Sequence, residues 1–548
     1  MNRLWRVAYA LELVVAGLLT LGAIALHFNV MRHAGPLWRD EISSLRLATM
    51  PTLAEFWSSL VYDPMPALFF AVLRGWHFLG WGASDENLRY LGFVIGLGVL
   101  GAIWVAGWVI KKSPPIWAVL LFGLSPVALV WGDSLRAYGL SCIWNILAIG
   151  FFWKLLSERP QVTDIALASA AALLSVHSLF PNSLLLLAAG ASAIVIALRR
   201  GWRRTAFIIV GIGATAALSL LPYVPIIRRT QDWSALCNDG IDSAWILTMI
   251  FRATGAGGNL SATLWIAAAI VVCLAVALAI IKPPFFELSE DENDLLLYAG
   301  VTFLIALGGT VCFFRILGWT TSLWYYLPLM GTAALCLDAI AKILCKSITA
   351  MIASSLFIVT AAACLAPLVY RATNVRLTNV DLTAAAIKQH ARASDLVVVD
   401  NFFYAVSFYR YYHGKAPCLS VPGISDLSLH RWDLVKDTMS RPQPIQPVLE
   451  RIDQTLRSGH DVYVVGSVPL SRTAAAPPDL PAAPQTTAMW QLRPYIVRWT
   501  SQVAYAAQAH ARHGMIIPVP CEQPVSNVED VHAYVVSGWR EPALANLQ

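Results

Sequence analysis

The chain has 548 residues, of which 57% are hydrophobic and 13% are charged, and its formal net charge at pH 7 is +6. Soluble globular proteins carry about 25% charged residues, so this composition excludes an ordinary soluble enzyme, a disordered chain and a nucleic-acid binder. It is typical of a polytopic membrane protein, in which a modest positive charge reflects membrane topology rather than an acidic partner.

The membrane part begins with basic residues, Arg3 and Arg6, followed by an apolar run that extends to about residue 28. The run is too long for the apolar core of a secretory signal, so we predict a signal anchor with a cytoplasmic N-terminus. Apolar runs recur as far as residue 369 and predict about eleven spans, near 7–27, 91–110, 116–132, 139–155, 164–178, 182–198, 205–227, 261–281, 295–314, 323–344 and 347–369. Lysine and arginine residues lie on alternate connections, which are therefore expected to be cytoplasmic.

Two connections on the opposite, outer side are long. Residues 29–90 contain a short apolar piece, 67–80, which is interrupted by Arg74 and His77. It is too short for a span and is typical of a helix lying in the membrane interface. Residues 228–260 are rich in glycine and are expected to form a mobile external loop.

The composition becomes that of a soluble domain near residue 370, which predicts a transmembrane domain over 1–370 and an outer domain over 371–548. Residues 396–399 and 462–465 are expected to be buried strands, 383–392 and 448–457 helices, and 473–487 a Pro/Ala-rich loop. An α/β layer domain follows, and the odd number of spans places it on the extracytoplasmic (periplasmic) side of the inner membrane. Cys418 and Cys521 lie in it and either pair or are two unrelated thiols; the nine cysteines contain no CxxC pair and no zinc-ligand spacing.

Asp40 and Glu41 form an acid pair just outside the first span. Carboxylates beside a hydrocarbon surface need partners or shifted pKa values, and one of them can accept the proton of an acceptor hydroxyl as a general base. The alternative is a solvated pair at the end of an interfacial helix.

Asp133, Arg136 and Tyr138 lie at the outer ends of the third and fourth predicted spans. On one helix, Asp133 and Arg136 would share a face, either as a surface ion pair of little energetic weight or as part of an external cavity shared with Asp40. Arg89 precedes the second span and can contact a lipid phosphate or hold a substrate phosphate. His177, at the end of another span, is either structural or part of the site.

All of these residues lie at outer loop ends in the predicted topology, whereas few charges lie within the predicted spans. A proton- or ion-coupled transporter is expected to carry ionisable residues near the middle of the membrane. The pattern therefore favours an enzyme that works at the outer interface over a carrier.

The order of these motifs resembles the polytopic GT-C glycosyltransferases. The branch it resembles comprises the protein O-mannosyltransferases and the bacterial aminoarabinose and galacturonic acid transferases of lipid A or its core (glycosyltransferase family 39). The resemblance covers about residues 1–200 and is carried by Trp38-Arg39-Asp40-Glu41, Asp63-Pro64-Met65-Pro66, Asn87-Leu88-Arg89-Tyr90, Arg136-Ala137-Tyr138 and His177. The family's frequent His-Pro-Pro appears here as Pro64-Met65-Pro66, so a role for that histidine is lost.

The resemblance implies a bundle of many transmembrane helices with interfacial helices in the first outer loop, and a sugar donor carried on a polyprenyl phosphate. It implies Asp40 as the catalytic base, with Glu41 and Asp133 as further catalytic acids. Arg89, Arg136, Tyr138 and His177 would bind substrate. Charge on the departing phosphate would be neutralised by the arginines or by a divalent cation, Mg²⁺ or Mn²⁺, held by Asp40 and Asp133.

The resemblance leaves the sugar and the acceptor (a lipid, a glycan or a protein hydroxyl) open. The partners expected are the lipid-linked donor, the acceptor and membrane lipids, with no nucleic acid. Two alternatives remain at this stage. One is a lipid or glycan transporter (flippase), and the other is a membrane scaffold whose C-terminal domain binds a partner.

Overall fold

The structure is a computed structural model that describes residues 3–281, 288–466, 476–484 and 490–540. The chain divides into two compact units, each built from separate segments of the sequence. The membrane unit comprises residues 1–33, 65–224 and 240–374, and the sheet unit comprises residues 34–64, 225–239 and 375–548. The predicted boundary near residue 370 falls beside the division after residue 374, and the sheet unit also includes two segments that the prediction assigned to the membrane part.

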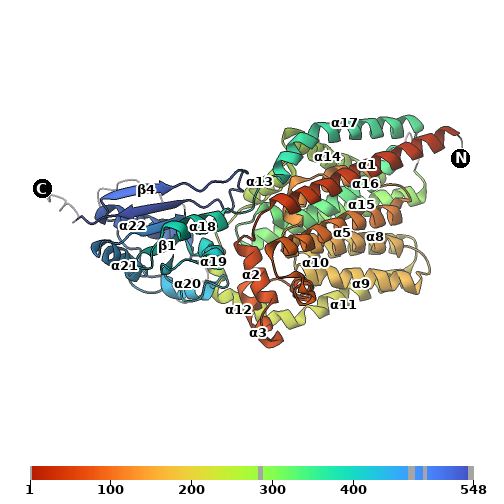
Figure 1. Cartoon of the computed structure of the whole chain (residues 1–548). Coiled ribbons are helices and arrows are strands. Elements are labelled where there is room, and N and C mark those ends of the chain that lie inside the picture. The colour runs from red at the N-terminus through yellow and green to blue at the C-terminus, as the bar shows by residue number, and fades with distance from the viewer. Residues whose placement is uncertain (1–2, 282–287, 467–475, 485–489, 541–548) are drawn as a thin grey trace. The chain divides into compact units, whose positions relative to one another are not determined.

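The membrane unit is a bundle of long apolar helices (Figure 1). Helix α5 packs against α8, α8 against α9, α10 against α15, and α1 against α17. The helices are α1 (Arg3–His33), α4 (Leu68–Trp76), η2 (His77–Trp81), α5 (Asp85–Lys111), α6 (Ile116–Ala118), η3 (Val119–Gly123), α7 (Pro126–Gly132), α8 (Ala137–Lys154), α9 (Val162–Ser178), α10 (Asn182–Arg199), α11 (Arg203–Ser219), η4 (Leu221–Tyr223), α13 (Ser243–Thr254), α14 (Asn259–Ile281), α15 (Glu290–Leu317), η6 (Leu323–Tyr326), α16 (Leu327–Leu344) and α17 (Ile348–Thr373).

The polytopic class is confirmed, but the predicted number of spans is too high. Within the described residues, 8 helices are long and apolar enough to cross a membrane, or up to 9 if one bent pair counts as a span. Three predicted spans account for the difference. The segment 116–132 is broken into α6, η3 and α7; α7 and α8 form the bent pair, at 116°; and α9 has only 17 residues. Hydropathy measures apolar length and does not register a break such as Ser125-Pro126, where a helix has to end and restart.

The sheet unit contains a five-stranded sheet with the order β2-β1-β3-β5-β4. Strand β1 is parallel to β2 and β3, whereas β5 is antiparallel to β3 and β4. The elements of this unit are α2 (Arg39–Ala48), α3 (Leu53–Ser59), η1 (Leu60–Tyr62), α12 (Val224–Ser234), η5 (Ala235–Cys237), α18 (Val380–His390), β1 (Leu396–Asp400), α19 (Phe402–Tyr411), β2 (Cys418–Val421), α20 (Trp432–Met439), α21 (Gln446–Arg457), β3 (Val462–Gly466), α22 (Arg493–His510), β4 (His513–Ile517) and β5 (Ala533–Ser537).

Helices cover both faces of this sheet, so its central strands are buried throughout, as the continuous apolar runs predict. Leu396 and Val398 of β1 pack with the residues of α20, α21 and α22. Val397 and Val399 point to the opposite face and pack with α18 and α19. The two predicted strands and the two predicted helices of this domain are confirmed as β1, β3, α18 and α21.

The expectation of a mobile loop over 228–260 is wrong, because most of that segment forms α12 and α13. The predicted loop over 473–487 lies partly outside the described residues, and its residues 476–484 form neither helix nor strand. Cys418 and Cys521 are free thiols, and Cys521 Sγ donates a hydrogen bond to the Gln523 carbonyl at 3.1 Å.

Candidate active site

The Asp40–Glu41 pair occupies the first turn of α2, in the sheet unit. Glu41 is fully buried, and its carboxylate accepts a hydrogen bond from the Trp38 backbone N–H at 3.2 Å, which caps the helix. The Asp40 side chain remains 25% exposed. Both negative charges lie at the positive end of the helix dipole, which stabilises them there. Of the two acids, Asp40 is therefore the one that solvent can reach.

His430, from the segment that precedes α20, lies against Asp40. Its Nε2 is 3.3 Å from Asp40 Oδ1, so Asp40 has a partner 390 positions away in the sequence. The imidazole lies against the rings of Phe403 and Trp432, with centroid distances of 6.3 and 6.0 Å. An ionised carboxylate only accepts hydrogen bonds, so Nε2 carries the proton when Asp40 is charged. The packed ring therefore holds this carboxylate oxygen of Asp40 in position.

Next to His430, Arg431 fixes the start of α20. Its guanidinium contacts Asp426 and Asp433, each at 2.7 Å, and lies over the Tyr62 ring, 4.8 Å from its centroid. Burial by itself would raise the pKa values of Asp426 and Asp433. Hydrogen bonds from Arg431 to both carboxylates, and from Ser428 to Asp426, outweigh the effect of burial, so both pKa values are lowered. These contacts hold the backbone beside His430 to Asp426, Asp433 and Tyr62.

Arg39, beside Asp40, is held by the C-terminal segment of the sheet unit. Its backbone N–H donates to Glu529 at 3.2 Å, and its guanidinium lies 5.5 Å from the centroid of the Phe403 ring. Arg39 Nε is 3.7 Å from Asp40 Oδ1, a long ion pair. Glu529 is buried, and burial raises its pKa to about 7. Its carboxylate also accepts a hydrogen bond from the Ser407 hydroxyl at 2.6 Å.

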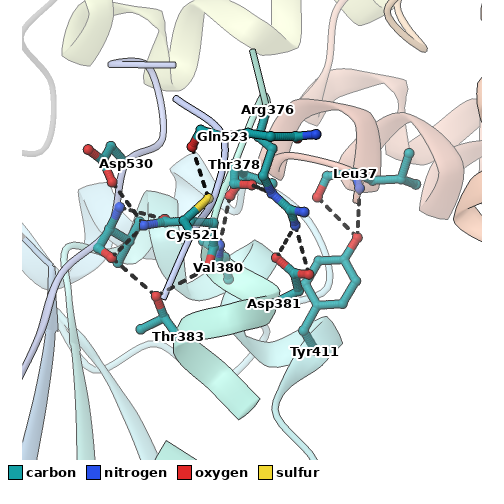
Figure 2. A network of polar contacts seen from close by, with 12 residues as sticks. Leu37, Arg376, Thr378, Val380, Asp381, Thr383, Tyr411, Cys521, Gln523 and Asp530 are labelled. Atoms are coloured by element: carbon teal, nitrogen blue, oxygen red, sulfur yellow. Dashed lines mark hydrogen bonds and ion pairs between the residues drawn. The ribbon is translucent and has the colours of Figure 1, made fainter. Parts of the chain in front are cut away.

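The chain leading into α2 is fastened to the C-terminal part of the same unit (Figure 2). The Tyr411 hydroxyl accepts from the Leu37 N–H at 2.8 Å and donates to the Leu37 carbonyl at 3.1 Å. Close by, Arg376 binds both oxygens of Asp381, at 2.8 and 2.9 Å. The position of Asp40 is therefore set by the folded sheet unit rather than by its own short connection.

A second polar cluster lies in the membrane unit, where the chain bends between α7 and α8. His27 Nδ1, on α1, is 2.9 and 2.8 Å from the two oxygens of Asp133. Both side chains are almost completely buried, and Arg89 of α5 lies within electrostatic reach of Asp133. A buried carboxylate needs such compensation, because an isolated charge in a medium of low dielectric constant is costly. The structure thus brings Asp133 and Arg89 together.

Two glycines on α5 allow this close approach. A Cβ atom on Gly92 would collide with the carbonyl oxygen of Asp133, and one on Gly96 would collide with its carboxylate and with the His27 ring. Glycine is the residue that permits such contact between a helix and another backbone. The cluster is therefore built into the helix packing of the membrane unit.

Asp133 and Arg136 do not share a helix face, contrary to the expectation from their spacing. Asp133 ends α7 and Arg136 precedes α8, and the two helices meet at 116°. Arg136 and Tyr138 are both buried at this bend, and the Tyr138 ring packs edge-on against Tyr325 with centroids 5.8 Å apart. The bend therefore holds three of the predicted site residues within six positions of the chain.

His177, at the end of α9, belongs to a different set of contacts. Its Nδ1 is 3.2 Å from the Tyr223 hydroxyl, and its Nε2 is 3.0 Å from the Ser219 hydroxyl. Tyr223 in turn accepts a hydrogen bond from the Ala67 N–H at 3.0 Å. His177 thereby connects α9 and α11 to the segment that opens α4.

Two histidines were missed by sequence reasoning. His27 had a usable signal, because an ionisable side chain inside a long apolar helix is rare and functional by default. His430 had no such signal, because no local sequence pattern relates it to Asp40, which lies 390 positions away.

The expected divalent cation has no complete set of protein ligands here. Among the described residues, no group of three or more His, Cys, Asp or Glu side chains could hold a metal ion. Asp40 and Asp133 each pair with one histidine instead. Mg²⁺ requires more oxygen ligands than either pair supplies.

Comparison with known proteins gives matches in structure alone. No protein-family model matches the chain, and no curated relative matches it in sequence. The crystal structure of ArnT from Cupriavidus metallidurans bound to undecaprenyl phosphate superposes with a TM-score of 0.51, 12% identity, and coverage of 82% of this chain and 92% of ArnT. The apo state of the same protein gives a TM-score of 0.50, with the same identity and coverage. The oligosaccharyltransferase AglB from Archaeoglobus fulgidus, in complex with an inhibitory peptide and a dolichol-phosphate, gives 0.49 at 12% identity, over 83% of this chain and 69% of AglB.

The chain therefore shares the fold of ArnT over most of its length. The predicted class, a polytopic GT-C-like bundle with a C-terminal α/β domain, is confirmed.

Proposed function

We propose that this protein is a membrane glycosyltransferase that moves a sugar from a polyprenyl-phosphate donor to a hydroxyl on an extracytoplasmic lipid, glycan or protein. The observation that carries the proposal is Asp40, a solvent-accessible carboxylate oriented by His430 in a chain with the fold of ArnT. The ArnT structure holds undecaprenyl phosphate, which supports a donor of the same chemical class.

The chemistry assigned to Asp40 is proton removal. The acceptor hydroxyl gives its proton to the carboxylate as its oxygen forms a bond to the anomeric carbon of the sugar. The bond from that carbon to the phosphate oxygen breaks, and its electron pair leaves with the polyprenyl phosphate. A single displacement of this kind inverts the anomeric centre. His430 acts as a positioning residue, because its hydrogen bond fixes one oxygen of Asp40.

We assign the donor phosphate to Arg89 and Arg136, because the planar guanidinium matches phosphate geometry. Tyr138 and His177 complete the proposed substrate-binding set. Asp133 is held by His27 on both oxygens, and we propose that it keeps Arg89 in position through its charge.

The isoprenoid tail has a candidate place in the membrane unit. An apolar groove of about 190 Å³ lies between α13, α14, α15 and α16, and its lining includes Phe251, Trp265 and Met330. The residues of α16 that line the groove follow Trp324 closely in the sequence. The ring centre of Trp324 lies 4.3 Å from that of Trp131, and Trp131 is next to the bend that holds Asp133. Burying the tail contributes about 0.8 kcal/mol per methylene, which keeps the donor in the bilayer.

We further propose that the membrane is the inner (cytoplasmic) membrane and that the sheet unit lies on the periplasmic side. This assignment rests on the positive-inside rule. The end of the membrane unit that carries Lys111, Lys112, Lys342 and Lys346 would then be cytoplasmic.

A lipid or glycan transporter is the second candidate function. Buried ionisable residues within the bundle favour it, namely the His27–Asp133 pair and the Lys111–Asp338 pair at 2.8 Å, because such residues mark transport pathways. The two functions differ in their product, since a transporter moves the donor without making a glycosidic bond.

Proteoliposomes distinguish the two. The full-length protein is reconstituted with a polyprenyl phosphate carrying a radiolabelled sugar and with an envelope lipid extract as the acceptor. We expect the label to move from the polyprenyl carrier to a new, chemically distinct product. Movement of intact donor between leaflets without such a product would overturn the enzyme and support the transporter.

A further inference from the structure

A pocket of about 400 Å³ lies at the end of the membrane unit opposite the Asp133 bend. It is formed where α1 and α15 begin and where α5, α8 and α16 end. Its lining holds four lysines and two acids: Lys111, Lys112, Lys342 and Lys346 against Asp291 and Glu292. The pocket is therefore positively charged on balance.

Ion pairs account for both acids of the lining. Glu292 pairs with Lys346 at 2.7 Å, and Asp291 pairs with Arg200 at 2.9 Å. Lys111 pairs with the buried Asp338. Lys112 and Lys342 therefore supply the excess positive charge, reduced at Lys342 by its electrostatic interaction with Glu12.

The remaining walls are apolar and aromatic. Trp5 and Trp153 line the pocket together with Ile110, Leu295 and Ile343. Indole side chains favour the headgroup level of a bilayer, and basic pockets between helices on the cytoplasmic side suit anionic headgroups. Lysines whose only role is to set the orientation of the protein in the membrane do not need to line a concave pocket with apolar walls. The shape of this pocket therefore favours a bound ligand.

We infer that this pocket binds a phosphate group, presented by an anionic phospholipid of the adjacent leaflet, with Lys112 and Lys342 as its principal contacts. The lipid would fasten the ends of five helices from different parts of the chain. This site is separate from the proposed catalytic residues, and the inference does not depend on the glycosyltransferase assignment.

The test measures the unfolding temperature of the full-length, detergent-purified protein, with phosphatidylglycerol, phosphatidylcholine or sodium phosphate added at matched concentrations. A ligand that binds only the folded state raises this temperature in a concentration-dependent way. We expect phosphatidylglycerol to raise it by several degrees and phosphatidylcholine to have little effect. The double variant Lys112→Gln/Lys342→Gln should lose more than half of the phosphatidylglycerol shift, and Lys112→Arg/Lys342→Arg should keep it.

Arg204→Gln is the matched control, because Arg204 is an exposed base at the same end of the bundle and does not line the pocket. It should respond as the wild type does. Equal shifts with the two lipids, or an undiminished shift in the Gln double variant, would overturn the site. If sodium phosphate alone gives the full shift and phosphatidylglycerol adds nothing, the lipid source is overturned in favour of soluble phosphate.

Should the double variant fail to fold, native mass spectrometry of the wild type gives an independent answer. The protein is exposed to an equimolar mixture of the two lipids, and the lipid that it retains is identified. At least fivefold enrichment of phosphatidylglycerol is expected, and Lys342→Gln should reduce it. Retention of the two lipids in equal amounts would contradict the proposal.

Discussion

Replacing His430 by alanine tests whether Asp40 depends on the fold of the sheet unit. The substitution removes the contact between Nε2 and Asp40 Oδ1 at 3.3 Å. A hydrogen bond to a charged group contributes about 1.5–3 kcal/mol. This contact is long and Asp40 is 25% exposed, so solvent screens it and the low end of that range applies. A loss of about 1.4 kcal/mol in the transition state corresponds to a tenfold lower kcat/KM.

The assay is sugar transfer in the proteoliposomes described above, with kcat and KM determined separately and the unfolding temperature measured alongside. We expect His430→Ala to lower kcat about tenfold, and His430→Gln to recover part of that loss because its amide can still donate. His513→Ala is the matched control, because His513 is exposed on β4 of the same unit, and it should leave activity unchanged. If His430→Ala folds normally and keeps the wild-type kcat, the positioning role of His430 is refuted.

Two further predictions concern packing and pH. Gly96→Ala should greatly reduce the yield of folded protein, because its Cβ would collide with Asp133 and His27, whereas Gly101→Ala, with no atom within 4 Å, should fold normally. Size-exclusion chromatography of the two variants side by side checks this, and equal yields would contradict the tight packing at α5. Glu529 has an ordinary pKa of 4.5 and a folded-state pKa of about 7, so the folded protein holds this proton longer than the unfolded chain does. The stabilisation that Glu529 contributes is therefore fully present below pH 4.5, and the free energy of unfolding falls by about 3 kcal/mol as the pH rises to 7. The unfolding temperature should fall over that window in the wild type and stay flatter in Glu529→Gln, and identical pH profiles would disprove the shifted pKa.

The secondary structure of the C-terminal domain was predictable from short apolar patterns. Residues 396–399 and 462–465 form continuous apolar runs rich in valine, and such runs become the buried, parallel strands β1 and β3. The strands β4 and β5 were not anticipated. In β4, four of the five residues are exposed, so its sequence lacks the apolar run that marks a central strand.

The membrane bundle was predictable in class but not in detail. Apolar length is a local property, and it identified α1, α5, α10, α11 and α14 to α17 well. The bend at Asp133 depends on how α7 and α8 pack against α5, including the absence of a Cβ at Gly92 and Gly96. No hydropathy window contains that information.

The candidate site was predictable only where its residues are adjacent in sequence. Asp40 and Glu41 stood out as an acid pair after an apolar span, but their different environments follow from the capping of α2 by Glu41. The contact with His430 bridges 390 positions and arises from tertiary folding.

The most direct test of the central claim, that Asp40 is the base of a glycosyl transfer, is mass spectrometry of envelope glycolipids. Cells lacking the gene are complemented with the wild type, with Asp40→Asn, or with Glu55→Gln, an exposed acid on α3 of the same unit. We expect a hexose, pentose or uronic acid that is present with the wild type and Glu55→Gln and absent with Asp40→Asn, at equal protein levels. A glycolipid profile with Asp40→Asn that matches the wild type would contradict the claim.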